Sequence, residues 1–580
     1  MRTFQRRIAA AIGAALGVDP APLESQFSTP PDRKLGDLAF PCFLLSKELK
    51  RAPVQIAGEL AALDLGLEWV SEVTAAGPYA NFRFHREQFA RQALAEIRSS
   101  GDEFGCSEAG AGRTIVIDYS SPNIAKHLAV HHLRSTMLGQ AMANIFRAAG
   151  YTVVGVNHLG DWGTGFGKLL CALERYGSED GLTESPLSER DDAITVLNGL
   201  YTRFNNEAKD HPELDDEARA WFQRLEAGDE LARARWKEIR QFSLARFQQV
   251  YDRLGVKFDE VIGESFFEDR MPVVIAELEE KGLLEESEDA QVVMVGEDIP
   301  PFLVRKKDGT TLYGTRDLAA VKQRWDTWHF DRCLYVVDAG QGLHFRQLFT
   351  VAQMLGWECA DRLEHSAFGV MRMQVDGGWA KGRTREGHVV LLEDVLDHAV
   401  EKARAVLLEK NPDIEDPDAI AEAVGVGAVI FSDMKARRIK DVNFDLEKIV
   451  SFEGETGAYL QNTHVRFCGL LRKSERQGFD PAAGAGAALT TDEDLTLLQE
   501  LLRFPEVVER AAEEAEPSIV SQYLLGVASA FNTYYAQHRV VDEAPEHAAR
   551  TADRLALVDR VRVTLRNGLR LLGITPLERM

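Results

Sequence analysis

Cysteine is sparse in this chain of 580 residues, and no two cysteines form a C-x-x-C pair. Metal-binding cysteines usually come in such pairs, and small disulfide-stapled domains need a denser and more regular spacing. The scattered thiols therefore argue against a zinc site, and they fit a reducing cytoplasm better than a secreted disulfide framework. They are Cys42, Cys106, Cys171, Cys333, Cys359 and Cys468.

Long apolar runs are also lacking, because no stretch approaches the roughly 18–20 residues that span a bilayer. We therefore expect no membrane segment and no membrane partner. Only the N-terminus imitates a targeting signal, with Arg6 and Arg7 before the apolar run 8–18. The same stretch places Phe4, Ile8 and Ile12 at helical spacing, so we favour an amphipathic helix.

The sequence also lacks a surplus of basic residues. The net charge is −24, whereas phosphate binding draws most of its affinity from lysine and arginine. A nucleic-acid partner would need local basic patches, and two candidates exist near the C-terminus. Taken alone, each is typical of a solvated face. The first patch is Lys435, Arg437, Arg438 and Lys440, and the second is Arg554, Arg560, Arg562, Arg566 and Arg570.

The length exceeds what one hydrophobic core supports, so we expect a multidomain α/β protein. Residues 1–110 predict an N-terminal α+β domain. Residues 111–395 alternate short β-branched runs with helices, which is typical of a parallel sheet, and a charged helical insertion occupies about 180–260. Residues 396–580 show almost only helical periodicity. The expected strands of the sheet are Thr114–Tyr119, Thr152–Val156, Cys333–Val337 and Ala367–Met373.

The richest segment for chemistry is Asp118–Thr136, which runs from a strand through a proline turn into a helix. Ligands of parallel sheets bind beyond the carboxyl ends of strands, and anions bind the free N–H groups of a helix's first turn. Four basic side chains near this turn indicate a phosphate-binding surface, although any one histidine could simply be packed. They are Lys126, His127, His131 and His132.

The same segment resembles the S-P-N-x-A-K-…-H-x-G-H-L-R-S-T signature of the arginyl-tRNA synthetases. The resemblance continues in Asn157–Thr164, Leu312–Ala320 and Gln341–Phe345 and reaches Leu572–Met580. It implies a Rossmann-like class I catalytic domain, an N-terminal domain that reads the tRNA elbow, and an all-α anticodon-binding bundle. It also implies arginine, ATP with Mg²⁺ and tRNA-Arg as partners of a cytoplasmic monomer, with no structural zinc.

The resemblance also assigns roles to residues. A planar guanidinium needs carboxylates and flanking acceptors, so the carboxylates of the arginine site are expected to bind it. The expected arginine site is Asp118, Asn123, His158, Asp161, Tyr313, Asp317 and Gln341. The expected ATP contacts are His127, His131, His132, His344, Lys381 and Thr384, with His132, Lys126, Lys381 and Arg385 as catalytic residues. The expected tRNA contacts are Tyr459, Gln461, His464 and Arg466.

The chain departs from the family pattern around this site. Ala129 stands where the family has the first histidine, and His131 stands where it has glycine. Losing one preorganised donor typically costs about 10²–10³ in rate. Asp118 stands where the family commonly has glutamate, and Gly165, Gly382 and Arg383 also differ from the pattern. Two alternatives therefore stay open: a paralogue that binds tRNA or arginine without charging, and an enzyme that activates arginine for another acceptor.

Overall fold

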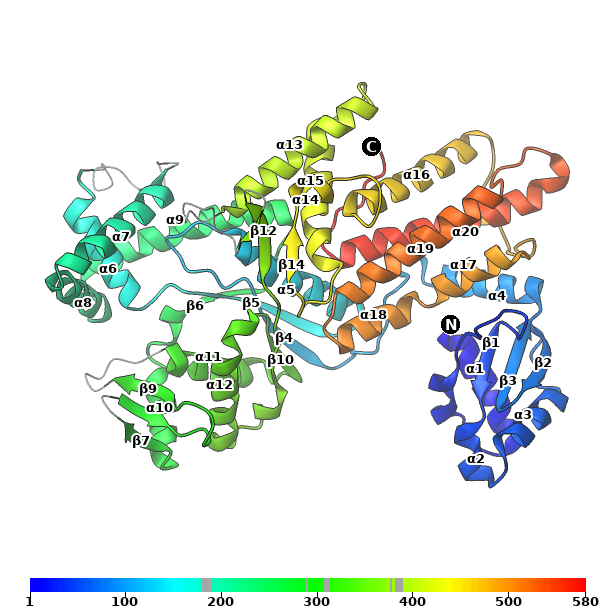
Figure 1. The fold of residues 1–580 in the computed structure, drawn as a ribbon, viewed down its shortest axis with the longest axis horizontal. Helices are drawn as coiled ribbons and strands as arrows, with labels where there is room; N and C mark the ends of the chain where they lie inside the picture. Colours follow the sequence, from blue (N-terminus) through cyan, green and yellow to red (C-terminus); the bar gives the residue numbers. More distant parts are fainter. Residues whose placement is uncertain are drawn as a thin grey trace.

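The structure is a computed structural model that describes the chain except residues 180–186, 188–189, 191, 288–289, 307–312, 376–377 and 381–389. Figure 1 shows three bodies: a small N-terminal unit, a central sheet flanked by two lobes, and a long helical C-terminal unit. The N-terminal unit hangs below the end of the helical unit, so the two ends of the sequence lie in neighbouring bodies.

The N-terminal unit folds as an antiparallel sheet of order β1-β3-β2 covered by helices. Phe4, Ile8 and Ile12 of α1 are buried, which confirms the helical interpretation of the N-terminus. Phe4 packs against Trp69 with ring centroids 4.9 Å apart. The elements are α1 (Arg2–Leu16), β1 (Leu38–Pro41), α2 (Phe43–Leu49), α3 (Pro53–Ala62), β2 (Val70–Ala76), β3 (Tyr79–Phe84) and α4 (Arg86–Ser99).

The central sheet has five parallel strands in the order β11-β10-β4-β5-β6. The chain starts in the middle strand, builds outward to β6 and then returns to the other side, so the strand order reverses beside β4. Ligands of such sheets bind at this reversal point, beyond the carboxyl ends of the strands. The strands are β4 (Thr114–Asp118), β5 (Thr152–Leu159), β6 (Glu260–Gly263), β10 (Arg332–Tyr335) and β11 (Leu363–His365).

The expected strand Ala367–Met373 is confirmed only from Met371, and its expected place in the parallel sheet is wrong. The edge strand β11 ends at His365, and β12 (Met371–Val375) belongs to another sheet, of order β13-β12-β14. Gly369 lies between them so close to the backbone of Lys440 that a Cβ would come within 2.6 Å of it. The chain therefore changes sheets here, which β-branched composition alone does not signal.

Two lobes flank the sheet. Long helices connect β5 to β6 and include the helical insertion that the sequence predicts, namely α6 (Thr164–Tyr176), α7 (Ala193–Asp210), α8 (Glu213–Glu226) and α9 (Glu230–Leu254). The second lobe pairs a small antiparallel sheet with three helices. Its elements are α10 (Met271–Glu280), β7 (Leu284–Ser287), β8 (Ala290–Val293), β9 (Phe302–Lys306), α11 (Tyr313–Trp328) and α12 (Gly342–Leu355).

The C-terminal unit is almost wholly helical, as the sequence predicts. Among the described residues, no helix has the length and apolar character needed to cross a membrane. Its elements, with the strands that join it to the sheet, are β13 (Gly378–Ala380), α13 (Leu392–Lys410), α14 (Pro417–Met434), β14 (Val442–Phe444), α15 (Leu446–Ile449), α16 (Gly457–Arg476), α17 (Asp492–Leu502), α18 (Phe504–Glu513), α19 (Ser518–Gln537) and α20 (Ala548–Leu571).

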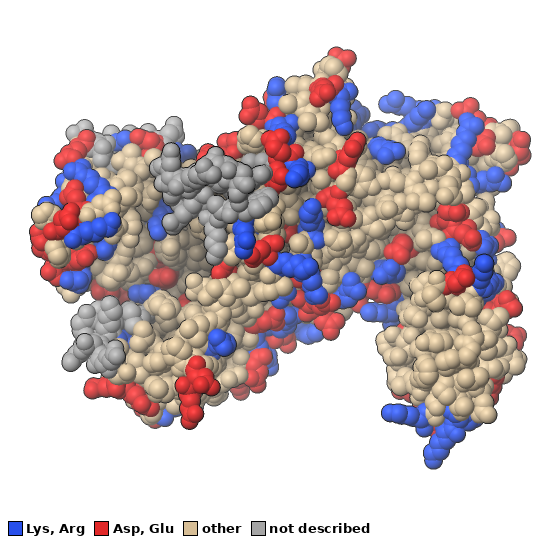
Figure 2. Space-filling model, viewed as in Figure 1, with Lys and Arg blue, Asp and Glu red and all other residues tan. Residues whose placement is uncertain are grey.

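Several members of the basic patches are engaged by acidic groups of the chain itself. Arg560 and Arg562 on α20 both pair with Asp559, and Arg566 pairs with Asp102 of the N-terminal unit. Arg437 and Arg438 approach the buried carboxylate of Glu516. Figure 2 accordingly shows basic and acidic side chains interspersed over the helical unit rather than one continuous basic face.

Candidate active site

The turn between β4 and α5 (Val130–Ala148) is the structural centre of the site. Three non-glycine residues in it, Ser120, Ser121 and Ala125, have φ angles of 70°, 48° and 61°. Such left-handed conformations cost free energy and persist where surrounding contacts impose them. Here the backbone N–H of Ala125 donates to Ser243 Oγ at 2.9 Å. This hydrogen bond to α9 of the helical insertion therefore helps to fix the conformation of the turn.

The helix start does not present all its N–H groups to a ligand. The Ala129 N–H donates to Nδ1 of His132 at 2.9 Å, and the Val130 N–H donates to the carbonyl of Val390 at 3.0 Å. Burial, followed by the neighbouring His131, lowers the pKa of His132 to about 3. His132 is therefore a neutral imidazole, and its ring lies 4.1 Å from the His131 ring at an interplanar angle of 36°.

The four basic side chains expected in one cluster divide into two pairs. His131 and His132 sit on the first turn of α5, whereas Lys126 and His127 contact the insertion. The Lys126 ammonium lies 5.7 Å from the ring centre of Tyr201, and Nε2 of His127 lies 3.0 Å from Thr195 Oγ1. Burial lowers the pKa of His127. Lys126 lies in the wall of a cavity of about 190 Å³ that Asn123, Trp162, Gly165 and Tyr201 also line.

Asp118, at the carboxyl end of β4, is buried and already paired within the protein. Its Oδ2 accepts from Nη2 of Arg324 at 2.6 Å, and its Oδ1 accepts from Ser121 Oγ at 2.7 Å. Although burial opposes ionisation, the Arg324 guanidinium keeps the pKa of Asp118 below its usual value. Both carboxylate oxygens are engaged, so Asp118 cannot form an unshared fork with a second guanidinium.

Arg324 was not predicted from the sequence. It lies on α11 seven residues after Asp317, a spacing that places both side chains on one face of a helix. That spacing is the signal that could have found it. Glu264 was missed as well, and its carboxyl lies 3.5 Å from Arg316. Burial raises the pKa of Glu264 to about 7, against the opposing effect of Arg316.

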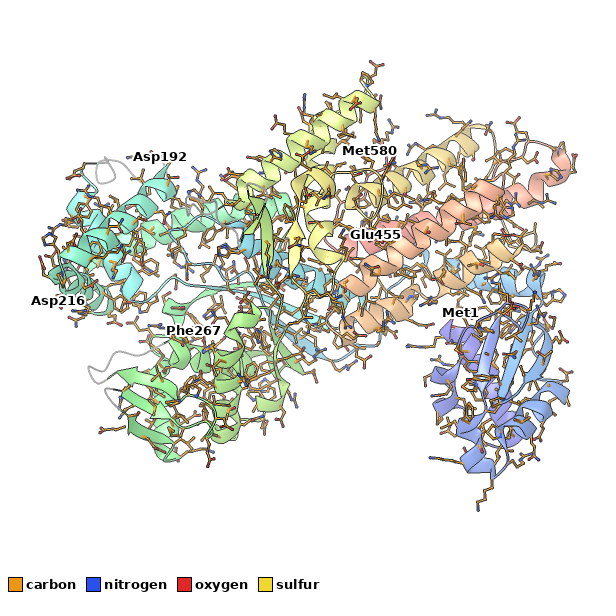
Figure 3. All side chains as sticks on the ribbon, in the orientation of Figure 1. Met1, Asp192, Asp216, Phe267, Glu455 and Met580 are labelled. Carbon is orange, nitrogen blue, oxygen red and sulfur yellow. The ribbon has the colours of Figure 1, made fainter. Side chains whose placement is uncertain are left out.

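His158 and Asp161, at the carboxyl end of β5, have different surroundings. Neither ring nitrogen of His158 has a hydrogen-bond partner in the described part of the chain, and its ring stacks on Phe267 at 5.5 Å. Figure 3 labels Phe267 where the second lobe meets the sheet. Asp161 is fully buried and pairs with Arg240 at 2.8 Å while accepting from the Ser265 N–H at 2.9 Å. Asp161 therefore holds loops together, whereas His158 keeps free acceptor capacity.

The second lobe supplies the remaining expected arginine contacts. Asp317 Oδ2 lies 2.7 Å from Nε2 of His344, and the Tyr313 ring lies 5.0 Å from the His344 ring. Tyr313 is 57% exposed, and Gln341 is exposed just before α12. Asp118 and Asp317 both favour protonation of His158 electrostatically, whereas burial, the largest effect, lowers its pKa. Both carboxylates therefore act electrostatically on the same imidazole.

The expected tRNA contacts separate into surface and interior residues. Gln461 is fully buried and donates to the carbonyls of Ala423 and Thr575. His464 is also buried, and its Nδ1 lies 2.7 Å from the Leu577 carbonyl oxygen. These side chains therefore anchor the C-terminal segment, and their burial disfavours direct contact with tRNA bases.

The side chains of Arg466 and Tyr535 lie at the surface, where a nucleic acid could reach them. The exposed Arg466 guanidinium lies 5.9 Å from the ring centre of Tyr535, which is 44% exposed. Tyr459 is partly buried, and its hydroxyl accepts from Asn532 Nδ2 at 2.6 Å. Lys381, Thr384 and Arg385 lie outside the described residues. Within the described part of the chain, no group of three or more His, Cys, Asp and Glu side chains could hold a metal ion.

A parallel sheet whose strand order reverses beside a histidine-bearing turn, joined to a helical C-terminal unit, defines a class I aminoacyl-tRNA synthetase architecture. Family models support this class over the whole chain. Residues 94–446 match the catalytic domain of "tRNA synthetases class I (R)", residues 2–84 match the arginyl tRNA synthetase N-terminal domain, and residues 460–580 match the DALR anticodon binding domain. The chain belongs to the arginyl-tRNA synthetase family.

Individual relatives agree. An arginine–tRNA ligase of Exiguobacterium sp. is 45% identical over 582 residues, covering 100% of this chain and 99% of that protein. One from Alkaliphilus metalliredigens is 40% identical with complete coverage of both. The Thermus thermophilus arginyl-tRNA synthetase structure superimposes with a TM-score of 0.79 at 27% identity, covering 99% of this chain and 100% of that one.

Proposed function

We propose that this chain joins arginine to tRNA-Arg in two ATP-dependent steps. The carboxylate of arginine attacks the α-phosphate of ATP, which forms arginyl-adenylate and releases pyrophosphate. A hydroxyl of the terminal ribose of tRNA then attacks the arginyl carbonyl carbon, which forms arginyl-tRNA and releases AMP. The observation that carries the proposal is His158 at the carboxyl end of β5, whose buried ring nitrogens have no hydrogen-bond partner among the described residues and which Asp118 and Asp317 both influence electrostatically.

The contacts divide the work between the two carboxylates. Asp317 is partly exposed, so it is the better partner for a substrate guanidinium, with Tyr313 beside it. The neutral His158 ring can accept a further N–H of that guanidinium. Arg324 and Ser121 already engage the oxygens of Asp118, so Asp118 would contribute negative electrostatic potential and not a direct contact with the substrate. Asn123 and Gln341 remain available for the polar groups at the other end of the amino acid.

ATP would meet the first turn of α5. His132 offers a neutral ring N–H to the α-phosphate region, and Lys126 offers a cation at the adjoining cavity. Lys381, Thr384 and Arg385 are proposed to bind the leaving pyrophosphate from the second loop. Mg²⁺ would arrive with ATP and neutralise its phosphates. Catalysis would consist mainly of orientation and charge stabilisation.

tRNA would span the molecule. The N-terminal unit would contact its elbow, and the exposed Arg466–Tyr535 pair would meet unpaired anticodon bases, since guanidinium and tyrosine faces both stack on bases. We propose a cytoplasmic monomer without structural zinc.

The second candidate is a paralogue that binds tRNA without charging it, which Ala129 and His131 favour. One experiment separates the candidates: charging of total tRNA with labelled arginine, ATP and Mg²⁺, beside tRNA binding by the same preparation. Labelled tRNA supports the enzyme. Binding without labelled tRNA supports the paralogue, and labelled arginine on another acceptor would indicate a different ligase.

A further inference from the structure

Arg134 is a buried cation near the site with partners from several parts of the chain. It lies two residues after His132 on α5 and is only 1% exposed. Its Nη1 donates to the carbonyls of Gly369 at 2.6 Å and Lys440 at 2.9 Å, and its Nη2 donates to the carbonyl of Arg438 at 3.2 Å. Its Nε lies 2.7 Å from Oδ1 of Asp433, which is fully buried.

The acceptors of Arg134 come from separate parts of the chain that meet beside α5. Gly369 precedes β12, whereas Arg438 and Lys440 precede β14, which pairs with β12 in parallel. Asp433 belongs to the last turn of α14. One guanidinium therefore fixes the starts of two strands and the end of a helix against the helix that carries His132.

The same joint continues into the anticodon-binding unit. Glu516, which precedes α19 and is 1% exposed, accepts hydrogen bonds from the Arg438 N–H at 3.2 Å and from Ser518 Oγ at 2.8 Å. Gly369 also donates to the Arg438 carbonyl at 2.9 Å. A continuous set of buried and partly buried polar contacts thus runs from the start of α19, through Arg438 and Arg134, to the first turns of α5.

Such a joint is a costly way to gain stability. Burying charges carries a desolvation penalty, and well-packed apolar groups of similar volume often stabilise as much. Burial raises the pKa of Asp433 even though Arg134 opposes this. A planar guanidinium with several fixed acceptors defines a single geometry, because its donors lie in a rigid plane. Lysine cannot reproduce that arrangement.

We infer that Arg134 is a positioning residue for arginyl transfer. It fixes the position of the helical C-terminal unit relative to the α5 turn that carries His132. The inference rests on the proposed function. tRNA held on the helical unit must deliver its terminal ribose to the site beside His132. A small shift of the helical unit relative to α5 would therefore misplace the acceptor ribose relative to the adenylate. A displacement of about 1 Å can cost roughly 10²-fold in rate.

The test compares Arg134→Lys with the matched control Arg332→Lys. Arg332 also ties the sheet to the helical unit, because it donates to the Glu513 carbonyl at 3.2 Å and pairs with Glu364 at 2.7 Å, but it lies on β10 away from the α5 turn. We expect kcat for charging, per titrated active site, to fall about 10- to 100-fold in Arg134→Lys. KM for arginine and ATP should change less than threefold, and Arg332→Lys should keep its kcat within threefold.

A second measurement does not depend on activity. Amide hydrogen exchange should accelerate in Met371–Val375 and Val442–Phe444 of Arg134→Lys, while β4 and β5 remain protected. Asp433→Asn, which keeps the carbonyl contacts, should show a smaller change in the same direction and serves if Arg134→Lys does not fold. Wild-type kcat per active site, or unchanged exchange in these strands, would overturn the inference. A wild-type chain that charges no tRNA would instead refute the proposed function, and exchange would still decide whether Arg134 fixes the strands.

Discussion

The Arg324 guanidinium donates to the Asp118 carboxylate at 2.6 Å, with the Arg324 and Asp118 side chains only 1% and 9% exposed. An arginine of the chain thus occupies a carboxylate that the sequence assigned to substrate arginine. Under the proposed function, the second lobe would therefore provide the carboxylate, Asp317, that binds the substrate side chain.

Replacing Arg324 by methionine should destabilise the protein by roughly 3–5 kcal/mol, because it leaves Asp118 buried and unpaired. Urea denaturation followed by circular dichroism measures this loss. The double variant Arg324→Met with Asp118→Asn should recover more than half of it, since no charge then remains unpaired. A loss below about 1 kcal/mol in the single variant would show that Asp118 is not held by this pair.

Glu264 should make stability fall between weakly acidic and neutral pH. Its folded pKa, about 7, lies above the ordinary value of 4.5, so its contribution is fully present below pH 4.5 and is lost as pH rises through 7. In Glu264→Gln this slope should disappear, which would raise the free energy of unfolding at pH 8 by about 1–3 kcal/mol. Glu260→Gln, at an exposed position on β6, is the control. Parallel pH profiles for wild type and Glu264→Gln would contradict the assignment.

His132→Ala should lower kcat for charging by about 10²–10³-fold through loss of one preorganised donor. Loss of its hydrogen bond with the Ala129 N–H should also cost about 1 kcal/mol of stability. Because the pKa of His132 is about 3, the wild-type pH profile should show no limb from this histidine between pH 5 and 9. His131→Ala, on the same turn, should leave the Ala129 bond intact and so controls for the stability effect alone, since His131 is itself an expected ATP contact. Equal kcat in His132→Ala and wild type would remove His132 from the catalytic group.

Sequence reasoning succeeded where a pattern is local or extends over a whole element. The parallel strands β4, β5 and β10 were predicted from β-branched runs, and α1 from helical spacing. It failed at Ala367–Met373, because a close backbone approach at Gly369 decides where the chain changes sheets.

The site was predictable to a smaller extent. Asp118 and Asp317 were identified through motifs, but the competing Arg324 is distant from Asp118 in sequence and becomes its partner only through tertiary packing. Gln461 and His464 show the converse: a motif identifies residue types, whereas the tertiary structure buries these two against the chain's own carbonyls.

Gln461→Met tests that reassignment. Removing its amide leaves the carbonyls of Ala423 and Thr575 without this donor, so stability should fall by about 1–3 kcal/mol. KM for tRNA, measured on folded protein, should stay within about twofold of wild type. A large rise in KM without any loss of stability would restore Gln461 to the tRNA-binding surface.

Arg466 and Tyr535 should show the opposite behaviour. Stacking of a base on an aromatic side chain contributes about 1–3 kcal/mol, so Tyr535→Ala should raise KM for tRNA roughly 5- to 100-fold, and Arg466→Ala by a smaller factor. Pyrophosphate exchange per active site, measured at saturating tRNA, should stay near wild type, because neither side chain lies near the α5 turn. Arg404→Ala removes an exposed cation from α13 and should leave KM unchanged, which controls for the loss of positive charge. If all three variants raise KM for tRNA equally, the stacking role of Tyr535 is refuted, because the effect would then not depend on the aromatic ring.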